Sequence, residues 1–218
     1  MAPRTPARSP HAHCLVLLVR HGTTPSTGKV LPGRAPGLHL SEKGREQAAA
    51  TAARIASLAT APTAIYASPL ERTRETAAPI AKALGLRVRA DAGLLECDFG
   101  DWTGKRLAQL RKKREWEQVQ RAPSLFRFPK GESFGEMSAR SYGAVAALAA
   151  RHSGQTIVAV SHADPIKAIL ATALGAPLDL FQRLTVSPCS VSALLISPAG
   201  PHVLAINSTN SLKELALS

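Results

Sequence analysis

The segment from Cys14 to Gly22 constrains the fold more than any other part of the chain. Six apolar residues, Cys14 to Val19, form a short run of the kind that is typical of a fully buried strand. Arg20, His21 and Gly22 follow directly, so the strand ends by delivering a cation, an imidazole and a glycine into a loop. Open α/β sheets bind their ligands at the carboxyl edge of the strands. The segment therefore predicts a polar site at such an edge.

Strands and helices alternate along the rest of the chain. Short apolar runs predict strands at residues 63–67, 86–90, 156–160, 191–196 and 203–206. Longer segments of helix-forming residues predict helices at residues 41–58, 68–84, 105–121, 133–152 and 165–174, with a helical turn at 178–181. This alternation indicates an α/β fold. We expect a three-layer sandwich, in which a mostly parallel mixed sheet carries helices on both faces.

One of these helices begins with a strong start signal. Ser68 is the expected N-cap, Pro69 takes the first helical position, and Glu71 completes a capping box. Arg72 lies in the first turn of the same helix. Because a helix N-terminus that follows a strand binds anions readily, Arg72 is a candidate ligand for a phosphate.

Length and composition indicate how many domains the chain forms and where they begin. A chain of 218 residues with 45% hydrophobic residues is sufficient for one domain, which we expect at residues 14–218. Residues 1–13 are rich in proline and arginine, and we expect them to form a disordered basic extension. The three cysteines are widely spaced, which predicts free thiols and a cytoplasmic location. No apolar run is long enough to span a membrane.

The net charge of +12 is unevenly distributed. Nine lysines or arginines lie between Lys105 and Lys130, against only two acidic residues. They form either a basic rim that attracts anionic substrates, such as sugar or carboxylated phosphomonoesters, or a solvated helix face. Nucleic-acid binding is the weaker interpretation, because Trp116 is the only residue of this segment suited to base stacking and no nucleic-acid-binding module is present.

The strand ends carry the groups that phosphoryl transfer requires. Two predicted strands each end in a histidine, His21 and His162, and Arg20, Arg72 and Glu96 lie in the loops and helix starts nearby. A neutral imidazole can attack phosphorus, and fixed guanidinium groups can neutralise the phosphoryl oxygens. A carboxylic acid can protonate the leaving oxygen.

Six stretches of the chain then appear in the order of one known family. They are VRHGTT at residues 19–24, HLSEKGREQA at 39–48, SPLERTRETA at 68–77, LLECDFGDWTG at 94–104, GESFGEM at 131–137 and VSHADPIKAIL at 160–170. With these stretches, the chain resembles the histidine phosphatase superfamily, also called the phosphoglycerate mutase-like family. The resemblance covers nearly everything from Leu15 to about Ser211.

The resemblance implies a role for each group. His21 would be the nucleophile that becomes phosphohistidine, and Glu96 would be the general acid that later activates water. Arg20, Arg72 and His162 would hold the phosphoryl group. These neighbours should keep His21 neutral, because like charge lowers the pKa of an imidazole.

The expected substrate-binding residues come from the same stretches and from the long loop after the first strand. They are Arg20, Gly22, Thr24, Thr27, Gly33, Arg34, Arg72, His162 and Ala163. No metal and no cofactor is expected, since the sequence lacks an HExxH motif or another paired-histidine spacing.

Four positions leave alternatives open. Thr27 stands where many members of the family have asparagine, although its hydroxyl can still donate to a phosphate. Asp98 and Asp101 lie close to Glu96 in sequence and compete with it for the role of proton donor. Asp164 stands where small residues are common in the family. It either orients substrate hydroxyls or caps the helix that follows.

The leading hypothesis is a cofactor-independent phosphatase that acts on a small anionic phosphorylated metabolite through a phosphohistidine. Residues 97–135 would form a lid-like segment over its site. A phosphoglycerate mutase-like phosphomutase is the alternative within enzymes, and a non-catalytic module that binds phosphorylated ligands is the alternative outside them. The expected partner is the phosphorylated substrate; neither nucleic acid nor a membrane is expected, and a homodimer is left open.

Overall fold

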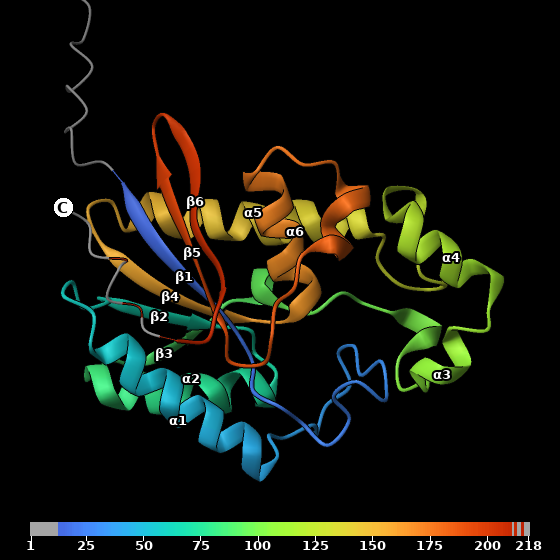
Figure 1. The fold of residues 1–218 in the computed structure, drawn as a ribbon, viewed down its shortest axis with the longest axis horizontal. Coiled ribbons are helices and arrows are strands. Elements are labelled where there is room, and N and C mark those ends of the chain that lie inside the picture. The colour runs from blue at the N-terminus through green and yellow to red at the C-terminus, as the bar shows by residue number, and fades with distance from the viewer. Residues whose placement is uncertain (1–12, 211, 213–214, 216–218) are drawn as a thin grey trace, which may run out of the picture.

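A computed structural model describes residues 13–210, 212 and 215 of the chain (Figure 1). The predicted basic extension therefore lies outside the described residues, except for His13. Six strands form one sheet in the order β3-β2-β4-β1-β5-β6. The strands and helices are β1 (Cys14–Arg20), α1 (Glu42–Ala56), β2 (Ala64–Ala67), α2 (Glu71–Leu84), β3 (Val88–Ala90), α3 (Leu107–Leu110), α4 (Arg114–Arg121), α5 (Phe134–Arg151), β4 (Thr156–Ser161), α6 (Ala163–Ala173), β5 (Val191–Ser197) and β6 (Gly200–Ser208).

The sheet is mixed, with a parallel part that contains the predicted polar edge. Strands β1, β4, β2 and β3 are parallel to one another, whereas β5 and β6 are antiparallel additions on the other side of β1. Arg20 of β1 pairs with Ser161 of β4 at the carboxyl ends of both strands. This register brings the residues that follow them, His21 and His162, to the same point of the sheet edge.

Helices cover both faces of the sheet, as Figure 1 shows. Successive side chains of a strand point to opposite faces, so β1 contributes to two cores. Val16 and Leu18 pack in one hydrophobic cluster with residues of α5 and α6. Leu15 and Leu17 pack in another with residues of α1 and α2. Because β1 is buried on both sides, its sequence is continuously apolar, and the predicted three-layer α/β sandwich is confirmed.

A third cluster lies beside the sheet and is rich in aromatic residues. Its rings come from Phe99, Trp102, Phe126, Phe128 and Phe134, and neighbouring centroids such as those of Phe99 and Phe128 are 4.9 Å apart. This cluster supports a lobe that contains α3 and α4 at the right of Figure 1. The lobe places the basic segment next to the carboxyl edge of the strands.

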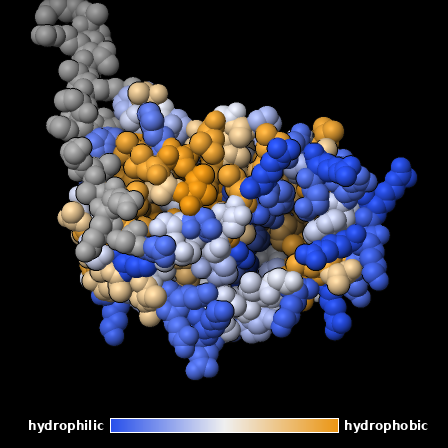
Figure 2. Space-filling view, in the orientation of Figure 1, coloured by the Kyte–Doolittle hydropathy of each residue, from blue (hydrophilic) through white to orange (hydrophobic). Residues whose placement is uncertain are grey.

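Hydrophilic residues gather over this lobe in Figure 2, and the surface is hollowed between the lobe and the sheet. The prediction of one helix at residues 105–121 is wrong, because the structure has two short helices, α3 and α4. The break falls in the run of four consecutive cations from Arg111 to Arg114. Charge repulsion within this run weakens a continuous helix.

Two helix starts also differ from the prediction. Helix α2 begins at Glu71, and its N-cap is Leu70, without a side-chain hydrogen bond. Ser68 therefore forms no capping box, because its buried hydroxyl pairs with His162 instead. Helix α6 begins at Ala163, two residues earlier than predicted, and its N-cap is His162.

Candidate active site

The two histidines at the sheet edge face one another. The ring centroids of His21 and His162 are 5.2 Å apart, in a T-shaped arrangement. Both side chains are buried, with His21 5% exposed and His162 fully enclosed. The parallel pairing of β1 and β4 thus creates the juxtaposition that the sequence predicts.

The hydrogen bond of His21 fixes its tautomer. Its Nδ1 lies 2.8 Å from the carbonyl oxygen of Gly22. Because a carbonyl can only accept, Nδ1 carries the hydrogen and the lone pair of the neutral ring is on Nε2. Burial, followed by the charges of Arg72 and Arg20, lowers the pKa of His21 to about 3. The ring is therefore a neutral nucleophile at physiological pH. Burial lowers the pKa more than the charges of Arg72 and Arg20 do, whereas the sequence predicts only the effect of the charges.

Two guanidinium groups accompany the histidines. Arg72 is fully buried, and its Nη2 donates to the carbonyl of Gly33 at 2.8 Å. Arg20 donates through Nη1 to the carbonyl of Val186 at 2.7 Å. Each of these contacts uses one donor. Nε and Nη1 of Arg72 and Nε of Arg20 are buried and have no acceptor among the described residues.

Such buried donors without an acceptor are costly, so they favour an anion at this point. The N-terminus of α6 also follows His162 directly, with Ala163 as its first helical residue. The unpaired backbone N–H groups of a first helical turn attract negative charge. An electropositive centre therefore surrounds His21. It consists of the guanidinium groups of Arg20 and Arg72 and the N-terminus of α6.

His162 is oriented by a serine whose role the sequence does not reveal. Its Nε2 lies 2.9 Å from Oγ of Ser68, which is completely buried. Its Nδ1 has no hydrogen-bond partner within the described chain and lies 3.9 Å from Oε2 of Glu96. Burial and the charge of Arg72 hold the pKa of His162 well below its usual value. The ring is thus neutral, with one nitrogen left for a ligand.

Glu96 brings a carboxylic acid to the same centre. It is 7% exposed, and its Oε1 accepts the backbone N–H of Cys97 at 3.0 Å. Burial, together with the negative charge of Asp164, raises its pKa to about 7. A carboxyl group with this pKa can both donate and accept a proton near neutral pH.

The two rival acids are engaged elsewhere. The side chain of Asp98 is 42% exposed, and its Oδ1 accepts the backbone N–H of Gly100 at 3.0 Å. Asp101 is 48% exposed and lies 3.5 Å from the ammonium group of Lys130. Among the described residues, neither carboxylate forms a hydrogen bond or ion pair with His21 or His162. The geometry therefore favours Glu96 as the acid.

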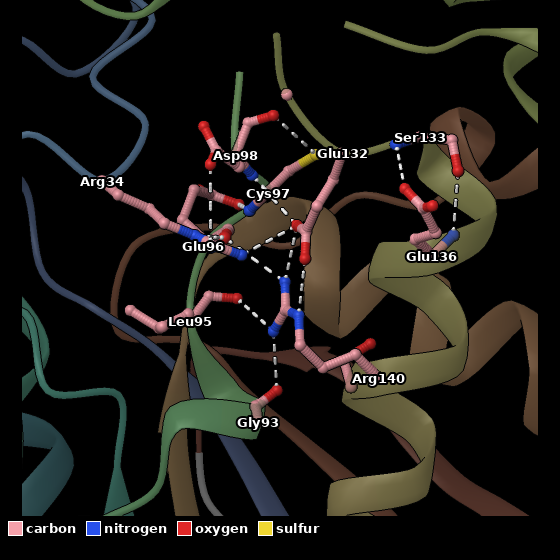
Figure 3. A network of polar contacts seen from close by, with 12 residues as sticks. Arg34, Gly93, Leu95, Glu96, Cys97, Asp98, Glu132, Ser133, Glu136 and Arg140 are labelled. Atoms are coloured by element: carbon pink, nitrogen blue, oxygen red, sulfur yellow. Dashed lines mark hydrogen bonds and ion pairs between the residues drawn. The ribbon is translucent and has the colours of Figure 1, made fainter. Parts of the chain in front are cut away.

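A network of ion pairs holds the loop that carries Glu96 (Figure 3). Arg140 reaches from α5 and donates through Nη1 to the carbonyls of Gly93 and Leu95, at 2.9 and 3.0 Å. Its Nε and Nη2 each lie 2.9 Å from an oxygen of Glu132. Arg34 donates to the carbonyl of Glu96 at 2.8 Å and pairs with Glu132 at the same distance. We call Arg34, Glu132 and Arg140 the charged clamp.

The long loop after β1 contains the remaining residues that the sequence nominates. The N–H of Gly22 donates to Oγ1 of Thr76, and a Cβ at this position would lie 2.6 Å from the carbonyl oxygen of Gly44, so Gly22 serves close packing. Thr24 and Thr27 bond to one another through their hydroxyls at 3.0 Å.

Gly33 has a different part in the same loop. It has a φ of +54°, which favours glycine, and its carbonyl accepts from Arg72. Arg34 belongs to the charged clamp. The loop thus supports the arginines, and a direct contact of its residues with substrate stays a prediction.

Comparison with known proteins decides the family. The model of the histidine phosphatase superfamily (branch 1) matches residues 16–209. The chain belongs to the histidine phosphatase superfamily. It is 31% identical to phosphoserine phosphatase 1 of Hydrogenobacter thermophilus over 207 residues, which cover 91% of this chain and 94% of that protein. It is 34% identical to a probable phosphoglycerate mutase of Klebsiella pneumoniae over 180 residues, 81% of this chain and 82% of the relative.

A solved structure extends the similarity to three dimensions. The native mycobacterial glucosyl-3-phosphoglycerate phosphatase superposes with a TM-score of 0.78 and 27% identity, over 90% of this chain and 99% of that one. The predicted histidine phosphatase family and phosphatase class are therefore confirmed.

For this histidine phosphatase, the sequence predicts the residues around His21 but not the residues that hold them in position. The structure brings together Arg20, His21, Arg72, Glu96 and His162, all of which the motifs nominate. Ser68, Glu132 and Arg140 are supports that sequence reasoning missed. A signal for Glu132 was available, because Glu132 lies in the GESFGEM stretch that matches the family. That match gave no chemical reason for an acid at this position.

Proposed function

We propose that this chain hydrolyses a small phosphomonoester through a phosphohistidine on His21. The observation that carries the proposal is the state of His21, a buried neutral imidazole with its lone pair on Nε2. Two guanidinium groups with unsatisfied donors and a carboxyl group of raised pKa lie around it. These groups match the nucleophile, the charge stabilisation and the acid that phosphoryl transfer requires.

The reaction has two steps. In the first, Nε2 of His21 forms a bond to phosphorus while the bond from phosphorus to the ester oxygen breaks and Glu96 gives its proton to that oxygen. In the second, Glu96 accepts a proton from water, the water oxygen bonds to phosphorus, and the bond from phosphorus to nitrogen breaks. Arg20 and Arg72 stabilise the charge on the phosphoryl oxygens in both steps. Ser68 donates to Nε2 of His162, so that Nδ1 of His162 can donate to the phosphoryl group.

The superfamily membership also leaves a phosphomutase to consider. A mutase must retain the phosphoryl group and return it to the substrate. Residues 104–131 form only a short lobe beside the site, which favours transfer of the phosphoryl group to water. Residues 97–135 as a whole are still proposed to act as a lid-like segment. A non-catalytic binding module is disfavoured because the chain keeps every reactive group.

The proposed reaction needs neither metal nor cofactor, since the arginines supply the positive charge that a divalent ion would bring. Within residues 13–210, no cluster of three or more His, Cys, Asp or Glu residues is arranged to hold a metal. Nucleic acid is not a proposed partner, and a homodimer stays a prediction.

A cytoplasmic location is part of the proposal. All three cysteines are buried free thiols, which suits a reducing compartment. None of the helices that the structure describes has the length and apolar character needed to cross a bilayer.

The test is a screen of phosphorylated metabolites with phosphate release as readout and His21→Ala as the control. Release from at least one phosphomonoester by the wild type alone supports the proposal. Transfer between two positions of a substrate, dependent on a bisphosphate primer and without net release, would assign a mutase instead. Binding of phosphorylated compounds without either reaction would assign the non-catalytic module.

A further inference from the structure

A cavity of about 310 Å³ lies between the aromatic lobe and α6, next to the electropositive centre. Its apolar lining includes Phe99 and Trp116, and its polar lining includes Asp164, Lys167 and Gln182. Asp164 is only two residues beyond His162, in the first turn of α6. On the opposite side, a Cβ at Gly33 would lie 3.3 Å from the Phe99 ring, and the carbonyl of Gly33 binds Arg72. The cavity is therefore connected to the phosphoryl centre on both sides, through Asp164 to His162 and through Phe99 and Gly33 to Arg72.

A larger cavity of about 500 Å³ exists between α1 and α2, but none of the groups around His21 lines it. Its polar lining, which includes His39 and Glu75, is already paired. The smaller cavity, in contrast, contains Asp164, which is two residues from His162, and so lies closer to the part of a substrate that leaves the phosphorus.

Asp164 is the unusual group of the smaller cavity. Its side chain is 19% exposed, and its Oδ1 lies 4.0 Å from Nζ of Lys167. That ammonium group is itself held by Oε1 of Gln182 at 3.1 Å. No hydrogen bond reaches the carboxylate of Asp164 from the residues described. A mostly buried carboxylate without a hydrogen-bond donor is costly.

Helix capping does not account for Asp164. The N-cap of α6 is His162, and no side chain makes a capping hydrogen bond there. Among the described residues, the carboxylate therefore makes neither a capping hydrogen bond nor a close ion pair, although the dipole of α6 favours a negative charge at its place in the first turn. It lines a cavity beside the centre in which a leaving group can lie.

We propose that this cavity is the leaving-group subsite and that Asp164 is its specificity-determining residue. The inference rests on the proposed phosphatase function. Asp164 selects phosphomonoesters whose leaving group bears a hydroxyl or ammonium group within two or three bonds of the ester oxygen. It disfavours leaving groups with a carboxylate at the same place, because two carboxylates repel one another in a largely desolvated site.

This selection acts at shorter range than the basic rim. Cations of the lobe such as Lys105 and Arg106 are exposed and steer any phosphate-bearing molecule toward the site. Asp164 then discriminates among the molecules that arrive. The substrate class is accordingly a phosphorylated alcohol with neighbouring hydrogen-bond donors, of a size suited to the lower end of small-molecule sites.

The test uses four phosphomonoesters of matched size. They differ at one position and are phosphoethanolamine, ethylene glycol monophosphate, propyl phosphate and phosphoglycolate. kcat/KM is measured for each with the wild type, with Asp164→Asn and with Glu117→Gln. Glu117 is an exposed acid on α4, 65% exposed in its ion pair with Arg121, so its variant makes the same change of charge outside the cavity. Propyl phosphate corrects for any change in the acidity of Glu96, which affects all four esters.

For the wild type, we expect kcat/KM to be higher for phosphoethanolamine and ethylene glycol monophosphate than for propyl phosphate. We expect it to be lower for phosphoglycolate than for propyl phosphate. Asp164→Asn should reduce the ratio of phosphoethanolamine to phosphoglycolate at least tenfold, and Glu117→Gln should leave that ratio unchanged. An equal ratio in wild type and Asp164→Asn, with p-nitrophenyl phosphate still hydrolysed, would overturn this inference alone. A wild-type preference for phosphoglycolate would overturn it as well. Failure to hydrolyse p-nitrophenyl phosphate and all four esters would overturn the proposed function and the inference together.

Discussion

The proposed phosphoryl-binding residues and the proposed acid, Glu96, are held in place in different ways. His21 and His162 stand at the ends of two paired parallel strands, and Arg72 stands in the first turn of α2. The backbone of regular elements therefore fixes these three groups. Glu96 lies on a loop, and the charged clamp connects that loop to the segment after β1 and to α5.

This difference predicts two kinds of response to mutation. Loss of a group at the strand ends removes chemistry but leaves the sheet intact, because the backbone pairing of β1 and β4 does not depend on it. Loss of a clamp residue leaves every reactive group present but removes the contacts that hold Glu96 in position. Each of the following predictions tests one side of this comparison.

The largest effect is expected for His21→Ala. Phosphate release should fall to the background rate, because the other neutral imidazole, that of His162, accepts from Ser68 through Nε2 and has no lone pair left for phosphorus. The free energy of unfolding should change little by comparison, since the strand register is set by the backbone. Steady-state phosphate release and thermal unfolding, measured on one preparation, check both halves. Substantial turnover by the folded variant would contradict the role of His21.

Glu96→Gln should have the next largest effect, and it should depend on the leaving group. General acid catalysis contributes about a hundred- to ten-thousand-fold. The burst rate of an alkyl phosphate should fall by this order, whereas an activated aryl phosphate, whose anion leaves unaided, should lose little. The burst phase is measured because dephosphorylation also uses Glu96.

The pH profile provides the control for this variant. Since the pKa of Glu96 is raised to about 7, the wild-type burst with an alkyl phosphate should decline as the pH rises through 7. Glu96→Gln should lose this decline. An equal loss for both esters in the burst would contradict Glu96 as the acid and direct attention to Asp98.

Arg140→Met should have a smaller effect that reaches both stability and catalysis. It removes two hydrogen bonds to Glu132, which keeps its pair with Arg34, and leaves the carbonyls of Gly93 and Leu95 without their donor. The free energy of unfolding should therefore fall by about 1–3 kcal/mol. Turnover of alkyl phosphates should fall more than that of aryl phosphates, because the clamp acts through Glu96. Denaturant unfolding and burst kinetics measure the two effects.

Arg127→Met is the matched control for the clamp. Arg127 pairs with Glu136 at the solvent-exposed surface, with side chains 59% and 52% exposed, so its loss should change stability little and leave the burst rate unchanged. The clamp also lowers the pKa of Glu132, so its stabilisation is present above the ordinary glutamate pKa of about 4.3 and is lost as the pH falls below it. A stability difference between wild type and Arg140→Met that grows in acid would contradict the clamp.

The smallest effect is expected from exhaustive chelation, which should leave turnover unchanged. The guanidinium groups of Arg20 and Arg72 already supply positive charge to the centre. Phosphate release before and after chelator treatment, followed by addition of single metals, measures the effect. Activity that is lost and then restored by one metal alone would show that the centre needs an ion.

Local signals were sufficient for the sheet and the phosphoryl centre. The continuous apolar run of β1 requires burial on both faces, and the residues after a buried parallel strand must lie at its carboxyl edge. Ser68 shows where local signals fail. Its sequence context favours a capping box, but a buried histidine 94 residues later, just after the neighbouring strand β4, competes for the hydroxyl and forms the observed bond.

The charged clamp could not be predicted for a related reason. Arg34 is far from Glu132 and Arg140 in sequence, and all three are charged residues of the kind that usually lies at a protein surface. Their meeting depends on how α5 crosses the sheet and on the path of the loop after β1, which no local pattern specifies. The split of the basic segment into α3 and α4 likewise depends on the aromatic cluster beneath it and on charge repulsion along it.

The most direct test of the account is to trap the covalent intermediate. Wild-type protein is mixed with a phosphorus-labelled aryl phosphate, quenched within the burst and digested, and the labelled peptide is sequenced. We expect a label that is stable in base, labile in acid and attached to His21, and that is absent from His21→Ala. An acid-stable label, a label on His162 or Ser68, or turnover without any labelled protein would contradict it.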